Sequence, residues 1–77
     1  MLPENEKKVA LIEKYKDTLA AISKANPDPA NGTEYDLGVC LDMLKKDFTD
    51  AQAGKPIEFD FEGSDTFDWE AFGKDLA

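Results

Sequence analysis

The chain has 77 residues and a formal net charge of −8, with 17 acidic residues against nine lysines and neither histidine nor arginine. The absence of histidine removes the usual general base near neutral pH and the commonest metal ligand. A protein that binds nucleic acid directly needs a basic stripe, and this composition offers none. We therefore expect a protein that is not an enzyme and has no direct contact with nucleic acid.

The length predicts one small domain over residues 1–77. Cys40 is the only cysteine, so no disulfide reinforces this domain, and a lone cysteine fits a reducing compartment. No apolar run approaches the roughly 18–20 residues of a membrane-spanning helix, and the N-terminus has no apolar block of the signal type. We expect a soluble, cytoplasmic protein without a membrane partner.

The first predicted element is a helix over residues 3–25. Its apolar residues recur at helical spacing and form one stripe, composed of Ile12, Tyr15, Leu19 and Ile22 with Val9 and Leu11 beside them. Asn26 ends the helix, because the residue before a proline is driven out of the helical region. Residues 26–32 then form a stiff connector, since Pro27 and Pro29 limit its freedom.

The second predicted element is a helix over residues 34–53. Thr33 and Asp36 have the spacing of a capping box, in which the threonine bonds an unpaired N–H and the acid reaches back. The apolar stripe that follows contains Leu37, Cys40, Leu41, Met43, Leu44, Phe48 and Ala51. Gly54 and Pro56 stop the helix. Two amphipathic helices joined by a short connector favour an antiparallel hairpin.

The third predicted element is an acidic and aromatic segment over residues 56–76. In an extended strand, one face carries the apolar Ile57, Phe59 and Phe61 and the other carries Glu58, Asp60 and Glu62. Gly63 and Ser64 form a turn.

Two alternatives follow that turn. Asp65 or Thr66 caps a short helix in which Trp69, Phe72 and Leu76 share a face, or residues 66–69 return as a second strand. We favour the helix, because the hairpin sets the charges of Asp60 and Asp68 directly opposite each other. The predicted fold is mostly α, a small α+β domain in which a two-helix antiparallel hairpin precedes a short strand or hairpin and a short C-terminal helix.

The negative charge is concentrated in the last third of the chain. Residues 57–77 carry seven acids against Lys74 alone, a net charge of −6, whereas residues 1–30 balance five acids with five lysines. A focused negative field recruits basic partners. The candidate partner-binding residues are Glu58, Asp60, Glu62, Asp65, Asp68 and Glu70, with Phe67 and Trp69 as apolar anchors. The competing interpretation is that the acids form a solvated face and the aromatics complete the core.

No cofactor or metal site is predicted. The calcium-loop template started at Asp47 places Glu58 correctly at its twelfth position, but it puts Ala51 at a ligand position and Gln52 where glycine is required. The paired carboxylates do not suggest a glycosidase, because a chain of this size rarely builds a sugar cleft. Cys40 lies in an apolar stripe and is interpreted as a small buried hydrophobe.

Two functional hypotheses follow from these patterns. In the first, the protein is an inhibitor that presents a negative surface to the basic site of a nucleic-acid-handling protein. Small acidic proteins of this general design occur among phage anti-restriction and anti-CRISPR proteins, and the similarity is one of design rather than sequence. In the alternative, the protein is an assembly module that dimerises, or docks on a larger complex, through a strand edge and exposed aromatics.

Overall fold

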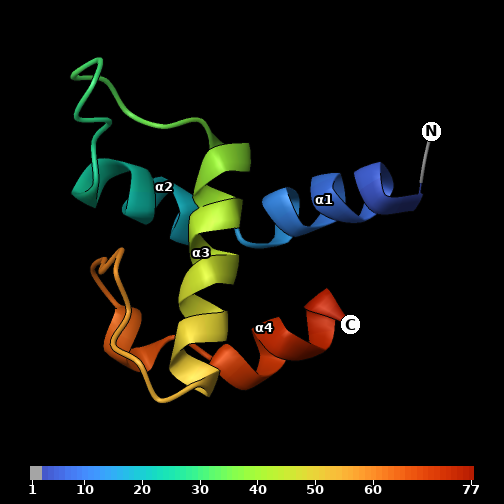
Figure 1. The fold of residues 1–77 in the computed structure, drawn as a ribbon. Coiled ribbons are helices and arrows are strands. Elements are labelled where there is room, and N and C mark those ends of the chain that lie inside the picture. Colours follow the sequence, from blue (N-terminus) through green and yellow to red (C-terminus); the bar gives the residue numbers. More distant parts are fainter. Residues whose placement is uncertain (1–2) are drawn as a thin grey trace.

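The computed structural model describes residues 3–77, with side chains from residue 5 onward. Its elements are α1 (Pro3–Lys14), α2 (Lys16–Ala25), α3 (Leu37–Gln52), the 3-10 turn η1 (Ser64–Thr66) and α4 (Trp69–Leu76). Helix α3 occupies the centre of Figure 1, and α4 lies beside its C-terminal end. None of the helices in residues 3–77 combines the length and apolarity needed to cross a membrane. The prediction of a mostly helical small domain is confirmed.

The first predicted helix, residues 3–25, is divided at Tyr15 into α1 and α2. Tyr15 has φ −106° and ψ 20°, and its backbone hydrogen bonds to the neighbouring turns persist, so the break is a bend. The prediction of one continuous helix was therefore wrong. The cause is tertiary packing, because the Tyr15 ring contacts Phe67 and Phe72 at centroid distances of 5.9 and 5.1 Å.

The bend changes how the helices pack. Figure 1 shows α1 and α2 running across α3 on either side of it, rather than lying along it as an antiparallel hairpin. Both helices contact α3. The prediction of an antiparallel hairpin was wrong, because the two helices cross α3 instead of running alongside it (Figure 1). Helix α3 begins at Leu37, with Asp36 as its N-cap and the Asp36 carboxylate accepting the Val39 N–H at 3.0 Å. The capping box predicted from Thr33 therefore does not form; Asp36 is itself the cap.

The strand predicted for residues 57–62 is absent, and no strand occurs anywhere in residues 3–77. The alternation of burial nevertheless holds: Phe61 is buried, Phe59 is half-buried, and Glu58, Asp60 and Glu62 are exposed. The backbone of residues 57–62 is hydrogen-bonded to side chains rather than to a neighbouring strand. The Asn26 amide, at the end of α2, donates to the Asp60 carbonyl at 3.0 Å.

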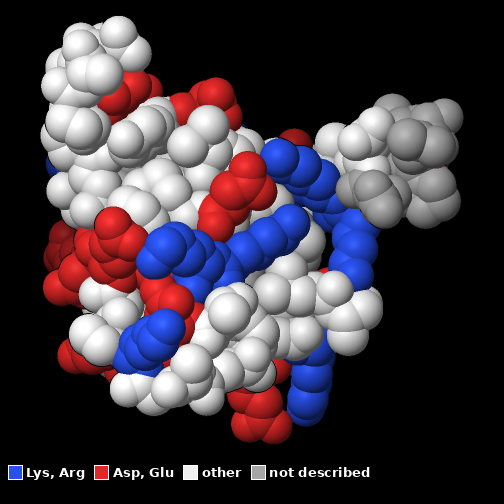
Figure 2. Space-filling model, in the orientation of Figure 1, with Lys and Arg blue, Asp and Glu red and all other residues white. Residues whose placement is uncertain are grey.

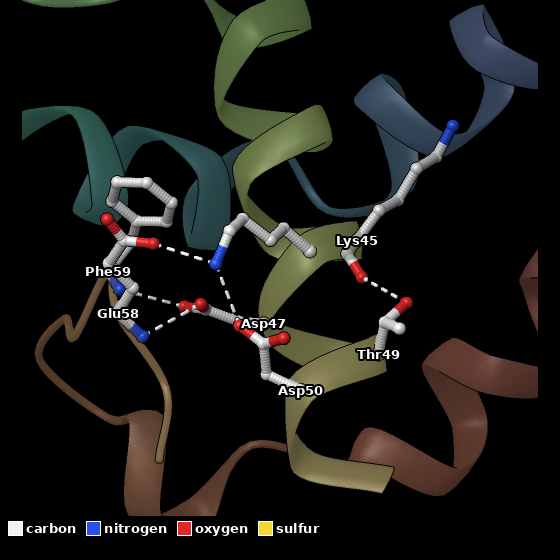
Figure 3. Close-up of polar contacts among 7 residues, drawn as sticks. Lys45, Asp47, Thr49, Asp50, Glu58 and Phe59 are labelled. Carbon is white, nitrogen blue, oxygen red and sulfur yellow. Dashed lines mark hydrogen bonds and ion pairs between the residues drawn. The ribbon is translucent and has the colours of Figure 1, made fainter. Parts of the chain in front are cut away.

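The main attachment of this segment is Asp47, a fully buried carboxylate on α3. Its Oδ1 accepts the Glu58 N–H at 2.9 Å and its Oδ2 accepts the Phe59 N–H at 3.0 Å. Figure 3 shows the Asp47 side chain pointing at these two backbone nitrogens. A buried carboxylate is tolerated only when its oxygens are hydrogen-bonded, and here both of them are.

Helix α4 closes the core and confirms the helical alternative for the C-terminal segment. Its N-cap is Asp68, which accepts the Ala71 N–H at 3.0 Å, and not Asp65 or Thr66. Phe72 is fully buried, and Trp69 and Leu76 pack against the same core. That core contains Leu11, Leu19, Ile22, Cys40, Leu41, Met43, Leu44, Phe61 and Phe72.

We predict that Asp47→Asn destabilises the fold by about 1–3 kcal/mol, because an amide accepts with only one of its two atoms and leaves one buried N–H without a partner. Urea unfolding measures this loss. The matched control is Asp42→Asn on the same helix, where the carboxylate is 61% exposed and lies 3.6 Å from the Lys8 ammonium. That change should stay within about 0.5 kcal/mol. Equal effects of the two substitutions would contradict the role assigned to Asp47.

Candidate functional site

The six candidate acids do not form one continuous strip. Glu58 is paired with Lys46 at 2.7 Å, and the same ammonium lies 2.8 Å from Asp50. Hydrogen bonds to Asp50 first, and then to Glu58, raise the pKa of Lys46 above its ordinary range. One lysine is therefore shared by two carboxylates, and this group of three side chains keeps a net charge of −1.

Two further candidate acids bond their own backbone. Asp60 Oδ1 accepts the Phe61 N–H at 3.0 Å and also accepts the Ser64 hydroxyl, which shapes the turn before η1. Asp68 caps α4 through Ala71. Substituting Asp60 or Asp68 would alter the local structure as well as the charge. A substitution at either position would therefore not test the effect of charge alone.

The other three candidates differ in their surroundings. Glu70 pairs with Lys74 across one turn of α4 at 3.6 Å, with both side chains largely exposed. Glu62 and Asp65 are exposed, and within the described part of the chain their carboxylates make no ion pair or hydrogen bond. These two acids are the ones most available to a partner.

The two candidate anchors lie in an aromatic cluster. Phe67 contacts Trp69 edge-on at a centroid distance of 4.8 Å, and Phe61 at 5.9 Å. Trp69 also stacks on Phe48 at 6.5 Å. Both Phe67 and Trp69 remain half-buried, so they complete the core while keeping part of their surface accessible.

An open groove of about 460 Å³ brings several of these residues together. Three aromatic residues are among those that line it, Tyr15, Phe61 and Phe67. Three carboxylates line it, from Asp17, Glu62 and Asp68, and its remaining lining residues are Thr18, Ala21, Gly63, Thr66 and Ala71. No lysine is among the residues that line this groove. We call it the acidic groove.

The lysines are concentrated elsewhere. A second groove, of about 370 Å³, is lined by Lys7, Lys8 and Lys45 with Leu11 and Leu76. On the face shown in Figure 2, lysines lie over the centre and right of the molecule and many carboxylates lie along its left side. The charges are nevertheless mixed, because α2 carries Lys16 and Lys24 as well as Asp17, and Lys24 lines a neighbouring groove together with Glu62.

Tyr15 connects the acidic groove to α4. Its hydroxyl donates to the Asp75 carboxylate, which also pairs with Lys14 at 2.7 Å. Burial, and then the hydrogen bond to Asp75, raises the pKa of Tyr15 to about 12. The hydrogen bonds from Lys14 and then Tyr15 lower the pKa of Asp75.

No group of three or more histidine, cysteine, aspartate or glutamate side chains in the described part of the chain is arranged to hold a metal ion. Cys40 is buried, and that burial raises the pKa of its thiol, which disfavours the reactive thiolate. The site chemistry available here is charge and apolar surface.

Sequence reasoning missed the contribution of Asp17 and Thr18 to the acidic groove. Both belong to α2, about 45 residues away along the chain from Glu62, and nothing local marks them. Asp47 was also missed, although a signal existed. Asp47 follows Cys40 and Leu44 at the spacing of the apolar stripe. The helical periodicity therefore predicts that its carboxylate lies on the buried face of the helix.

Comparison of this chain with protein-family models, with curated proteins and with solved structures finds no match.

We predict that stability falls as the pH rises from about 10 toward 12, because the folded state raises the pKa of Tyr15 from an unfolded value of about 10. A raised pKa means that the neutral hydroxyl stabilises the fold, fully below pH 10 and progressively less above it. Tyr15→Phe should remove this component, measured as the pH dependence of urea unfolding. Tyr35→Phe is the matched control, since its hydroxyl makes no hydrogen bond among the described residues. If wild type and Tyr15→Phe decline in parallel, another group is responsible.

Proposed function

We propose that this protein is a non-enzymatic acidic binding module that inhibits a nucleic-acid-handling protein by occupying its basic site, in the manner of phage anti-CRISPR and anti-restriction proteins. The observation that carries this proposal is the acidic groove, whose lining includes three acidic and three aromatic residues and no lysine. It lies mainly in the third of the chain whose net charge is −6. The proposed encounter takes place in the cytoplasm.

The absence of lysine from the lining of the groove supports a docking role for it. Glu58 and Asp75 pair with Lys46 and Lys14, whereas Glu62, which lines the groove, and Asp65, which follows it in the chain, make no ion pair among the described residues. A local field of this kind accelerates association with a basic surface and rejects nucleic acid. Apolar contact with the aromatic residues of the groove would then slow dissociation.

The alternative, an assembly module that pairs through a strand edge, finds less support. Residues 57–62 form no strand within the described chain, and their backbone is bonded to Asp47 and Asn26 instead. Phe67 and Trp69 are half-buried in one cluster and do not form a fully exposed patch.

We predict that the double variant Glu62→Lys, Asp65→Lys loses charge-dependent capture of a basic nucleic-acid-binding protein from a host lysate. Wild-type protein should retain that partner at low salt and release it along a salt gradient, because exposed charges are screened at high ionic strength. The expected loss is at least about tenfold in retained partner, since like charges then oppose each other across the interface.

The matched control is Glu6→Lys, Glu13→Lys, which changes the net charge equally at exposed positions on α1. Retention by this control together with loss by the groove variant supports a local site. Equal loss in both variants would mean that only net charge matters, and retention by all three proteins would contradict the proposal.

A further inference from the structure

The acidic groove has the composition of a receptor for a cationic side chain. Aromatic rings offer a negative face that attracts cations, and carboxylates at the edge bind the donors of the cation. Here the rings of Tyr15, Phe61 and Phe67 and the carboxylates of Asp17, Glu62 and Asp68 line one space. The groove is open to solvent, and its volume of about 460 Å³ is similar to that of the lysine-lined groove, so its lining rather than its size distinguishes it.

Phe67 keeps more accessible surface than Phe61, although four other aromatic rings pack against it. Phe61 is 7% exposed, so little of its face can be reached. The Lys14 ammonium already lies 5.7 Å from the Tyr15 ring centroid, although Lys14 does not line the groove. Phe67 is half-buried, and among the described residues no lysine is placed over its ring.

The carboxylates retain acceptor capacity. Asp68 uses Oδ1 to cap α4 through Ala71, which leaves Oδ2. Asp17 lies in the first turn of α2, and neither it nor Glu62 has an ion-pair partner within residues 5–77. Three acids from separate segments, with no cation among the lining residues, are complementary to one multivalent donor.

We propose that the acidic groove binds a single arginine side chain of the partner, with the guanidinium stacked on Phe67 and its donors bonded to Glu62, Asp17 and Asp68. Arginine fits better than lysine because its planar group stacks on aromatic rings and presents five donors in a fixed fork. A lysine ammonium is compact and strongly hydrated, so it gains less from the aromatic rings. This inference rests on the proposed function, and it names the chemical group that the site recognises.

The test is an NMR titration of the full chain with three capped peptides, Gly-Gly-Xaa-Gly-Gly, where Xaa is arginine, lysine or citrulline. Citrulline has nearly the shape of arginine without its charge. The arginine peptide should shift the backbone amide signals of Thr18, Gly63 and Ala71, which line the groove. The lysine peptide should bind roughly threefold more weakly and the citrulline peptide about tenfold more weakly.

Two variants locate the binding. Glu62→Gln should weaken arginine-peptide binding about fivefold, whereas Glu70→Gln changes the net charge equally outside the groove and should weaken it less than about twofold. Phe67→Leu should abolish the preference for arginine over lysine. Because Phe67 belongs to the aromatic cluster, this variant is compared only if its amide spectrum remains that of a folded protein.

Equal affinities for arginine and citrulline, or shifts confined to residues outside the groove, would overturn the inference. The outcome is separable from that of the lysate experiment. If the peptide fails while a basic protein is still captured in a charge-dependent manner, the arginine site is wrong and the proposed function stands. If the peptide binds in the groove and no basic partner is captured, the site stands and the inhibitor function is wrong.

Discussion

The carboxylate of Asp47 holds the C-terminal third of the molecule against α3. It is fully buried, and it bonds the N–H groups of both Glu58 and Phe59. These bonds replace the ladder that a neighbouring strand would provide, and they fix which side chains of the segment face inward. Phe61 then reaches the core, and the chain turns through η1 into α4. Without this attachment, the backbone of residues 57–62 would have few partners, and the acidic groove would lose one wall.

The groove depends on a second constraint, the packing around Tyr15. Its ring contacts Phe67 and Phe72, and its hydroxyl donates to Asp75, so the bend between α1 and α2 is held against α4 and the residue before its cap. Gly73 allows α4 to approach α3 closely, since a Cβ at that position would lie 2.6 Å from the ring of Phe48. An acid of α2 thereby comes to line the same space as two acids of the C-terminal segment.

The acids of residues 57–77 serve two purposes that composition does not separate. Five of the seven are engaged within the molecule, as a cap, a turn-forming carboxylate or a partner of lysine: Glu58, Asp60, Asp68, Glu70 and Asp75. Glu62 and Asp65 remain exposed, with no such partner in the described chain. A hydrogen-bonded carboxylate keeps its charge, and Lys74 is already counted in the net charge of −6. Among these acids, only Glu58 and Asp75 pair with lysines from elsewhere in the chain.

The sequence by itself determined the helical class, the approximate span of α3, the alternating burial of residues 57–62 and the apolar face of α4, because these depend on local periodicity and on proline and glycine signals. It also located the excess of negative charge. Only the tertiary structure decided the bend at Tyr15, the crossing of α1 and α2 over α3, the loss of the strand and the convergence of Asp17 with Glu62. Those features arise from contacts between residues far apart in the chain, where a ring or a buried carboxylate outweighs the local preference for a straight helix or a paired strand.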